Sequence, residues 1–440
     1  MKRRLIVLAL GLSFFLTACQ SDVESEMNEQ VVLHDDISIV IASDLHYLSP
    51  ELTDNGDYFM NLIQNSDGKL THYIPAITEA FVADVVAKNP DSVILSGDLT
   101  LNGHKKSHEG LIELLEPIVE ANIPIFIIPG NHDIGGKAYS FDNEGIYESA
   151  AVSSKEFLEL YDEFGYRQAL SKDISSLSYV AQMTDKVWVL MLDVNGYNLN
   201  GEIPEKTLEW VEEQLVLAEE SSATVLGVSH QNLNIHNRLF QSGYKMGRAD
   251  ELAALYQKYN VQLHLSGHLH LQNIIENEGV TEIATSSMAI TPNRFATVQI
   301  NKDLSMAYST QPVDVSLWAE NKGSTDENLL NFSSYSKTFF EETTELKFLE
   351  SIESLDIDTT EKKRMIAFAI DFNTHYFNGT LTEEVYDEQI IASWEKHLPN
   401  EFLTRYFNSI DESELGDKTN WKLSADDLGN DADRKIKLDK

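Results

Sequence analysis

The chain has 440 residues, of which 42% are hydrophobic and 24% are charged; this balance is typical of globular proteins and unlike that of disordered or fibrous ones. A chain of this length exceeds one ordinary hydrophobic core, so two folded units are expected. The formal net charge of −38 creates a field that repels nucleic-acid phosphates, which argues against a nucleic-acid polymer as a partner.

The N-terminal segment predicts export and lipid attachment. A basic start, Lys2–Arg4, precedes the apolar run Leu5–Leu16, which is too short to span a membrane comfortably. The Leu-Thr-Ala-Cys that ends at Cys19, the single cysteine, resembles the lipobox of bacterial lipoproteins. We expect residues 1–18 to be a signal peptide, Cys19 to carry a lipid on the outer face of the bacterial cell membrane, and the polar residues 19–36 to form a tether. A plain signal peptide or a short membrane anchor is the alternative.

From residue 37 onward, short β-branched runs alternate with amphipathic helical stretches, which is typical of an α/β unit with buried sheets. The expected strands are Ile37–Ala42, Ser92–Leu95, Ile125–Ile128, Val187–Leu192, Thr224–Val228 and Val261–Leu265, followed by Thr281–Ala284, Ala296–Ile300 and Ser305–Tyr308. The expected helices are Tyr73–Lys88, Lys105–Ala121, Ser154–Phe164, Glu205–Glu219 and Ala249–Tyr259. Residues 37–312 are therefore predicted to form one α/β domain, and the motifs described below predict that it is the catalytic one.

Beyond Pro312 the pattern becomes helical, and residues 313–412 are predicted to form a helical module. The expected helices are Leu329–Leu355, Thr360–Phe377, Glu383–His397 and Glu401–Ile410. Their aromatic residues fit the core of a helical bundle, and a base-stacking pocket is the alternative. Residues 413–440 are rich in Asp, Lys and Ser, so we expect an acidic, loosely ordered tail.

Polar side chains gather where five of the expected strands end. Because the carboxyl ends of strands in an open α/β sheet meet at one crevice, we expect these side chains to lie together. Imidazole and carboxylate ligands without thiolate suit Zn, Fe, Mn or Ni, and seven ligands fit two ions that share one carboxylate. Bound cations reverse the potential locally, so the acidic charge does not exclude a phosphate-ester substrate. The candidate ligands are Asp44, His46, Asp98, Asn131, His230, His268 and His270.

The order of these residues resembles the signature of the calcineurin-like metallophosphoesterases: D-x-H, G-D, G-N-H-D, a lone His and G-H-x-H, all between Asp44 and His270. The resemblance implies a four-layer αββα sandwich in which Asp98 bridges two divalent or mixed-valence ions (Mn, Fe or Zn). It places Asp44, His46 and His270 on the first ion, and Asn131, His230 and His268 on the second.

The same resemblance implies a metal-dependent phosphoric ester hydrolase in which hydroxide shared by the two ions attacks phosphorus. Asp98 and His132 are the expected catalytic residues. His132 is expected to protonate or stabilise the leaving oxygen, and Asp133 to orient its neighbours by accepting hydrogen bonds.

The chain looks most like the bacterial cyclic-nucleotide phosphodiesterase branch, so small phosphodiesters, with 3′,5′-cyclic nucleotides foremost, are the expected substrates. A phosphomonoesterase or phosphoprotein phosphatase is the alternative, less favoured because the residues after Gly97-Asp98 lack the arginine of the protein phosphatases. A non-catalytic metal-binding or ligand-binding lipoprotein is a third hypothesis. We expect the helical module to lean over the mouth of the cleft and narrow it.

Five further residues leave alternatives open. His104 and His108, four apart, offer either a metal pair or a solvated helix face. His264 is expected to face a packed side of its strand. Arg294 is either a contact to the substrate phosphate or an ordinary surface residue, and Asn195 either lines the cleft or makes a turn.

Overall fold

The computed structural model describes residues 36–411 and 414–424. The expected signal peptide, Cys19 and nearly all of the tether lie outside these described residues. Within them, no helix is both long enough and apolar enough to cross a bilayer.

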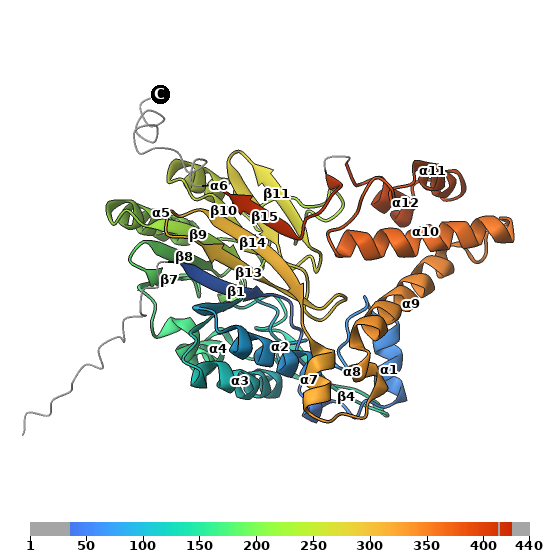
Figure 1. Ribbon diagram of the computed structural model, residues 1–440, viewed down its shortest axis with the longest axis horizontal. Coiled ribbons are helices and arrows are strands. Elements are labelled where there is room, and N and C mark those ends of the chain that lie inside the picture. Colours follow the sequence, from blue (N-terminus) through green and yellow to red (C-terminus); the bar gives the residue numbers. More distant parts are fainter. Residues whose placement is uncertain (1–35, 412–413, 425–440) are drawn as a thin grey trace, which may run out of the picture. The chain divides into compact units, whose positions relative to one another are not determined.

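Two β-sheets form the centre of the catalytic region (Figure 1). The six-stranded sheet has the order β15 (Asn420–Leu423), β14 (Met306–Pro312), β13 (Arg294–Ile300), β1 (Ile37–Ala42), β2 (Ser92–Leu95) and β3 (Ile125–Ile127). The seven-stranded sheet has the order β11 (Asn273–Asn277), β12 (Val280–Ala284), β10 (Leu263–Ser266), β9 (Thr224–Ser229), β8 (Val187–Leu192), β7 (Tyr179–Thr184) and β6 (Ser171–Lys172). Strands β1 to β3 run parallel to one another, as do β8, β9, β10 and β12.

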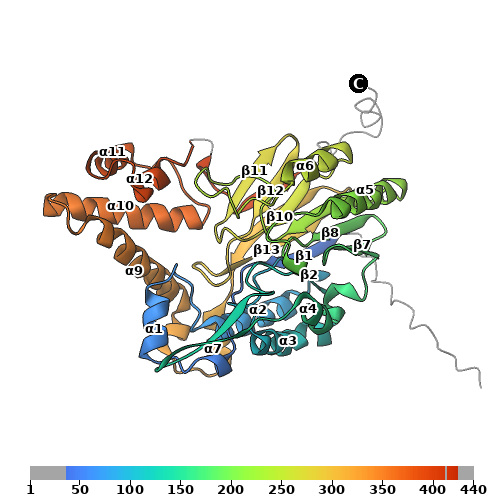
Figure 2. The same ribbon diagram turned by 180° about the vertical axis from the view of Figure 1, so that it is seen from behind.

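Helices cover the outer face of each sheet (Figures 1 and 2). They are α2 (Ile74–Lys88) and α3 (Lys105–Glu120) on the six-stranded sheet, and α5 (Glu205–Glu220) and α6 (Ala249–Lys258) on the other. Strand β8 shows the reason: Val189 and Met191 lie in the core between the sheets, while Trp188 and Leu190 lie in the core beneath α5 and α6. A strand buried on both faces reads as an unbroken apolar run. The expected four-layer αββα arrangement is confirmed.

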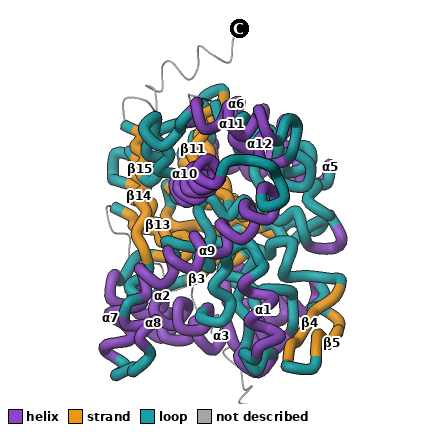
Figure 3. The backbone as a smooth tube through the Cα atoms, turned by 90° about the vertical axis from the view of Figure 1, so that its right-hand side faces the viewer, coloured by secondary structure: helices purple, strands orange, loops and turns teal. Residues whose placement is uncertain are grey.

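Several elements near the N-terminal half were not predicted from the sequence. They are α1 (Asp57–Gln64), the short turns Pro50–Leu52 and Gly196–Asn198, and a hairpin of β4 (Lys137–Asp142) and β5 (Gly145–Ala150), which lies beside α1 (Figure 3). The helix expected to reach Phe164 ends as α4 (Ser154–Leu160), and a π-helical turn follows at Asp162–Tyr166. The α-helix ends where Tyr161 leaves helical geometry, at φ −108° and ψ 18°, and Phe164 and Gly165 leave it again within the π-helical turn, with φ +109° at Gly165.

The C-terminal module consists of α7 (Val315–Asn321), α8 (Glu327–Leu330), α9 (Phe332–Ile352), α10 (Thr359–Phe377), α11 (Glu388–His397) and α12 (Phe402–Phe407). Phe348, Phe372 and Phe407 are buried together in one core, which agrees with the bundle-core interpretation of the aromatic residues. Leu269 and Leu271, on either side of the candidate ligand His270, belong to the same core. The module therefore packs directly against the last motif of the metal site.

Strand β15 corrects the expectation for the tail. Asn420–Leu423 pairs antiparallel with β14, with Trp421 opposite Tyr308, so a loosely ordered chain is the wrong description for these residues. Trp421 packs against the core of the catalytic region, and this burial stabilises a short edge strand that is otherwise polar. Residues 425–440 lie outside the described part of the chain.

Candidate metal centre

Both sheets supply candidate ligands at the carboxyl ends of their strands. Asp44 and His46 follow β1, Asp98 follows β2, and Asn131 follows β3. The ends of β9 and β10 in the second sheet supply His230, His268 and His270. The side chains expected at the crevice of a single sheet thus meet at adjoining edges of two sheets.

The first group consists of Asp44, His46, Asp98 and His270, whose ligand atoms all lie within 4.8 Å of one another. Nε2 of His270 lies 3.0 Å from Nε2 of His46 and 3.4 Å from Oδ1 of Asp44. Asp44 Oδ1 is buried and has no hydrogen-bond partner among the described residues. A buried carboxylate oxygen that faces imidazole nitrogens without a hydrogen bond fits a metal ligand.

The second group consists of Asp98, His230 and His268, again within 4.8 Å. Nε2 of His230 lies 3.1 Å from Oδ1 of Asn131 and 3.2 Å from Nδ1 of His268. Asp98 belongs to both groups, which is the arrangement expected of a carboxylate that bridges two ions. All seven candidate ligands therefore come together, and their donors suit two transition-metal ions.

Hydrogen bonds to backbone carbonyl groups determine which ring nitrogen of His230 and of His268 carries the proton and which one faces the metal centre. His230 Nδ1 lies 3.0 Å from the carbonyl oxygen of Ser96, and His268 Nε2 lies 2.9 Å from that of Gly243. A carbonyl oxygen only accepts, so each of these nitrogens carries the proton. The opposite nitrogens, His230 Nε2 and His268 Nδ1, then have free lone pairs for a metal.

The electrostatic field of the centre favours positive charge. Burial raises the pKa of Asp98, but His230 and the neighbouring imidazoles outweigh it and hold that pKa well below its usual range. Burial lowers the pKa of His230, but Asp98 and Asp44 outweigh it and raise the pKa to about 9. Carboxylates that draw a proton onto a fully buried imidazole would stabilise divalent cations in the same place.

The backbone at the site adopts uncommon conformations. Five candidate ligands have positive φ values: 52° at Asp44, 48° at His46, 47° at Asp98, 69° at His268 and 61° at His270. Asp and His tolerate this region better than most side chains, but each such residue costs about 1 kcal/mol or more, and such residues cluster at functional sites. The ligand loops are therefore held in place by the surrounding fold.

Two motif glycines allow the backbone to lie directly against the carboxylates of two candidate ligands. A Cβ at Gly130 would lie 2.2 Å from Oδ1 of Asp98, and a Cβ at Gly267 would lie 2.6 Å from Oδ2 of Asp44. Real Cβ atoms are not found so close to another heavy atom, so any larger residue would displace a candidate ligand.

His132 lies at the rim of the centre. Its Nδ1 is 2.7 Å from the carbonyl oxygen of Leu101 and therefore carries the proton, while Nε2 lies 3.9 Å from Oδ2 of Asp98. The side chain is 41% exposed, so Nε2 is accessible to a substrate. This placement is compatible with the predicted proton transfer to a leaving oxygen when the imidazole carries a second proton, on Nε2.

Asp133 is buried and orients its neighbours, as expected. Its carboxylate accepts hydrogen bonds from the backbone N–H groups of Leu99, Thr100 and Gly130 at 3.0, 2.8 and 2.8 Å. These bonds join the loop after β2 to the loop after β3. The loops that carry Asp98 and Asn131 are thereby fixed relative to each other.

A cavity of about 410 Å³ lies beside the second group and includes Asn131 and His268 in its wall. Its other lining residues are mostly amides and glycines: Ile134, Gly135, Gly136, Asn195, Asn198, Asn200, Gln231 and Gly243. Asn195 is one of these lining residues, which confirms that it lines the cleft, and its side chain donates to Pro129 O and to Gln231 Oε1. None of the residues that line this cavity comes from 313–412, and the predicted narrowing of the cleft mouth by the module stays a prediction.

The remaining histidine candidates have structural partners. His108 is buried between the hydroxyl of Tyr161 and the carbonyl oxygen of Asp133, at 2.9 and 3.0 Å. His104 instead caps the start of α3 by accepting from the backbone of Lys106. The two do not form a metal pair. His264 is buried and contacts the hydroxyl of Ser229 at 2.8 Å, as expected for a packed side.

Arg294 serves neither of its two expected purposes. Its Nη1 donates to the carbonyl oxygen of Asn378 at 2.7 Å and so ties β13 to the end of α10. Asp67 and Lys69, by contrast, lie beside the ligand His270 and were not predicted. They stand in a loop that carries no motif, so the sequence offered no signal for them.

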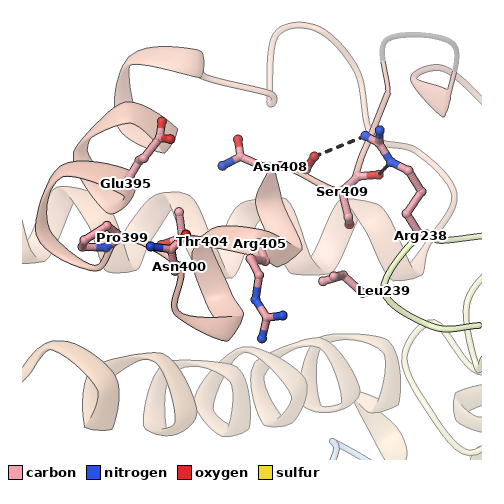
Figure 4. Close-up of a pocket in the computed structure, with 9 residues that line it drawn as sticks. All are labelled: Arg238, Leu239, Glu395, Pro399, Asn400, Thr404, Arg405, Asn408 and Ser409. Atoms are coloured by element: carbon pink, nitrogen blue, oxygen red, sulfur yellow. Dashed lines mark hydrogen bonds between the residues drawn. The ribbon is translucent and has the colours of Figure 1, made fainter.

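A second cavity, of about 420 Å³, lies between α11, α12 and the loop after β9 (Figure 4). Its Arg238 donates to the carbonyl oxygens of Ser409 and Asn408 and pairs with Asp411. The residues that line it contain no group of metal-ligating side chains. The chemistry is therefore assigned to the metal centre.

Both the catalytic region and the C-terminal module match families of known proteins. The sequence profile of the calcineurin-like phosphoesterase family matches residues 37–272, and that of the C-terminal domain of cyclic nucleotide phosphodiesterase matches residues 314–417. Among curated proteins, "Probable glycerophosphodiester phosphodiesterase GpdQ" of Arcobacter nitrofigilis is 26% identical over 59% of this chain and 87% of its own length. The 3′,5′-cyclic adenosine monophosphate phosphodiesterase CpdA of Haemophilus influenzae is 26% identical over 46% of this chain and 62% of its own.

Among solved structures, a dimetal phosphatase from Danio rerio aligns over 63% of this chain and 96% of its own, with a TM-score of 0.46 and 13% identity. The family profile covers more than half of the chain, and the side chains of its signature converge on one centre that groups ligands for two ions. The chain is a metal-dependent phosphoester hydrolase and belongs to the calcineurin-like phosphoesterase family.

Proposed function

We propose that this enzyme hydrolyses small phosphodiesters and that 3′,5′-cyclic nucleotides are its foremost substrates. The observation that carries the proposal is the cavity of about 410 Å³ beside Asn131 and His268. This volume is that of a small-molecule site. Its amides can hydrogen-bond a sugar or a base without needing a charged group on the substrate.

The charge of the cleft favours diesters over monoesters. None of the residues that line it in the described structure is Lys or Arg, so no protein cation there would neutralise the second charge of a phosphate monoester. A diester carries a single negative charge near neutral pH. A phosphomonoesterase or a phosphoprotein phosphatase remains the less favoured alternative, and family membership sets aside the non-catalytic hypothesis.

The residues of the site have complementary roles in the proposed reaction. Two ions bound there, drawn from Mn, Fe and Zn, would supply positive charge to the phosphate and lower the pKa of a water molecule. Asp98 would bind both ions, because it belongs to both ligand groups. In its doubly protonated form His132 would deliver the Nε2 proton to the leaving oxygen and remain a neutral imidazole, whose Nδ1–H stays bonded to the carbonyl oxygen of Leu101.

Two named relatives support the choice of substrate class. One is named as a probable glycerophosphodiester phosphodiesterase and the other as a 3′,5′-cyclic AMP phosphodiesterase, and both names describe small diesters. The match of residues 314–417 to the C-terminal domain of cyclic nucleotide phosphodiesterase favours the cyclic nucleotide.

The predicted lipoprotein signal supports a cellular location. We propose that Cys19 carries a lipid and holds the enzyme at the outer face of the bacterial cell membrane. The basis is the lipobox-like sequence around the single cysteine. An enzyme so placed would act on small diesters outside the cytoplasm.

A substrate panel tests the proposed activity. The Mn-loaded mature protein is assayed with 3′,5′-cyclic AMP, glycerophosphocholine, bis-nitrophenyl phosphate, nitrophenyl phosphate, a phosphopeptide and single-stranded RNA, with Asp98→Asn as the inactive control. The expected order places the small diesters first and cyclic AMP at their head. A higher kcat/KM for nitrophenyl phosphate, the phosphopeptide or RNA than for every small diester would overturn the diester proposal.

A further inference from the structure

A loop between α1 and α2 lies beside the outer nitrogen of His270. Oδ2 of Asp67 is 3.6 Å from Nδ1 of His270. The other ring nitrogen, Nε2, faces Asp44 and His46 in the first ligand group. The imidazole of His270 therefore stands between the Asp67 carboxylate and the position of the first metal.

The Asp67 carboxylate is held in that place by a cation. Nζ of Lys69 lies 2.5 Å from Oδ2 of Asp67, the same oxygen that approaches His270. The Lys69 side chain is 13% exposed and the Asp67 side chain 40% exposed, so the ion pair is shielded from solvent mainly on its lysine side. Neither residue belongs to a signature motif of the metal centre.

The C-terminal module fixes the backbone of the same loop. Gly68, at φ +90°, packs so closely on α9 that a Cβ there would lie 2.6 Å from the ring of Phe340. Nε2 of His72 lies 2.8 Å from the hydroxyl of Tyr335 on the same helix. The loop is thus enclosed between α9 and the metal centre, and it cannot carry Asp67 away without losing these contacts.

We propose that Asp67 is a positioning residue for the first metal, and that Lys69 and helix α9 hold it in that role. The carboxylate faces Nδ1 of His270 at 3.6 Å and would keep the ring proton on that nitrogen, which leaves the Nε2 lone pair free for the first metal. A carboxylate behind a ligating histidine fixes the tautomer and ring orientation and makes the imidazole a stronger ligand. The helical module then supports the metal centre through this loop.

This inference rests on the proposed two-metal site but not on the proposed substrate. It predicts an effect on one ion and not on the other, because Asp67 contacts His270 and no residue of the second group in the described structure. Metal binding can be measured without any substrate. A failure of the cyclic-nucleotide proposal would therefore leave the outcome of this test unaffected.

The test compares Mn binding by Asp67→Asn and Lys69→Gln with that of the unmodified protein, by equilibrium dialysis with elemental analysis and by EPR of bound Mn. Asp67→Asn is expected to weaken one site about 10- to 100-fold, so that at limiting Mn the EPR signal of a coupled pair gives way to that of a single ion. Activity should return as Mn is raised. Lys69→Gln should show the same pattern with a smaller loss.

Asp57→Asn is the matched control, because Asp57 is an exposed carboxylate ten residues earlier that undergoes the same change. It should leave both Mn affinities unchanged. Asp67→Glu keeps the carboxylate and should recover at least part of the affinity that Asp67→Asn loses. Unchanged binding in Asp67→Asn, or an equal loss at both sites, would overturn the proposal.

Discussion

The backbone N–H of His132 donates a hydrogen bond to Oδ1 of Asp98 at 2.8 Å. That oxygen is thus occupied, while Oδ2 lies 3.3 Å from Nε2 of His230 and 3.8 Å from Nε2 of His46. One carboxylate therefore connects the loops after β2 and β3 and also faces both ligand groups. Replacing Asp98 should therefore affect metal binding as well as turnover, whereas replacing the side chain of His132 should affect turnover alone.

Replacing Asp98 with Asn should reduce turnover to background and remove the paired metal centre. The amide keeps an acceptor for the His132 N–H but loses the charge that two ions share. The loss should exceed that of Asn131→Ala, which removes one ligand from one ion. Steady-state kinetics, elemental analysis and circular dichroism measure activity, metal content and fold. Near-normal activity with two bound metals would show that Asp98 does not bridge.

Replacing His132 with Ala should lower kcat by roughly two to four orders of magnitude while both metals stay bound, as expected when a proton donor is lost. The deficit should be smaller for nitrophenyl esters than for alkyl esters, because nitrophenolate leaves without protonation. The comparison is made on Mn-loaded protein of measured metal content. An equal deficit for both ester types would mean that His132 does not act as an acid.

His108 should make the protein less stable in mild acid. Burial lowers its pKa to about 4 in the folded chain, whereas an unfolded histidine titrates near 6.5. Below pH 6.5 the unfolded state binds more protons, so this stability is full above 6.5 and is lost as the pH falls toward 4. The predicted loss between pH 7 and pH 5 is about 2 kcal/mol. In urea titrations at both pH values, His108→Gln should reduce the pH dependence by that amount, and an unchanged dependence would contradict the assignment.

Replacing Cys19 with Ala should release the protein from the membrane fraction or leave its precursor unprocessed. The reason is that the thiol is the proposed site of the lipid and lies far outside the metal motifs. Catalysis by the purified Cys19→Ala protein should equal that of a purified protein that begins at residue 37, because Cys19 lies outside the catalytic region. Fractionation and intact mass measure the outcome. A mature protein that begins elsewhere than at Cys19 would refute the lipoprotein proposal.

The metal site could be predicted from the sequence because each candidate ligand stands in a short motif next to a recognisable strand. Each ligand follows a buried strand, and such strands read as continuous apolar runs, as β1 and β8 do. Asp67 could not be predicted, since its role depends on a contact with His270, which is distant in the chain. The β4–β5 hairpin was missed because its residues are mostly exposed and polar. Strand β15 was missed because its stability comes from pairing with β14.

The pairing of β15 with β14 means that the helical module is an excursion from the sheet and not an appendix to it. The chain leaves β14 at Pro312 and returns to pair beside it, where the N–H of Thr310 donates to the carbonyl oxygen of Thr419 at 3.0 Å. A stop codon after Pro312 would therefore remove an edge strand along with the helices. Excising the excursion and joining β14 to β15 through a tight hairpin turn would keep the edge strand and remove only the helices, which separates the contribution of α9 to the metal centre from that of β15 to the sheet.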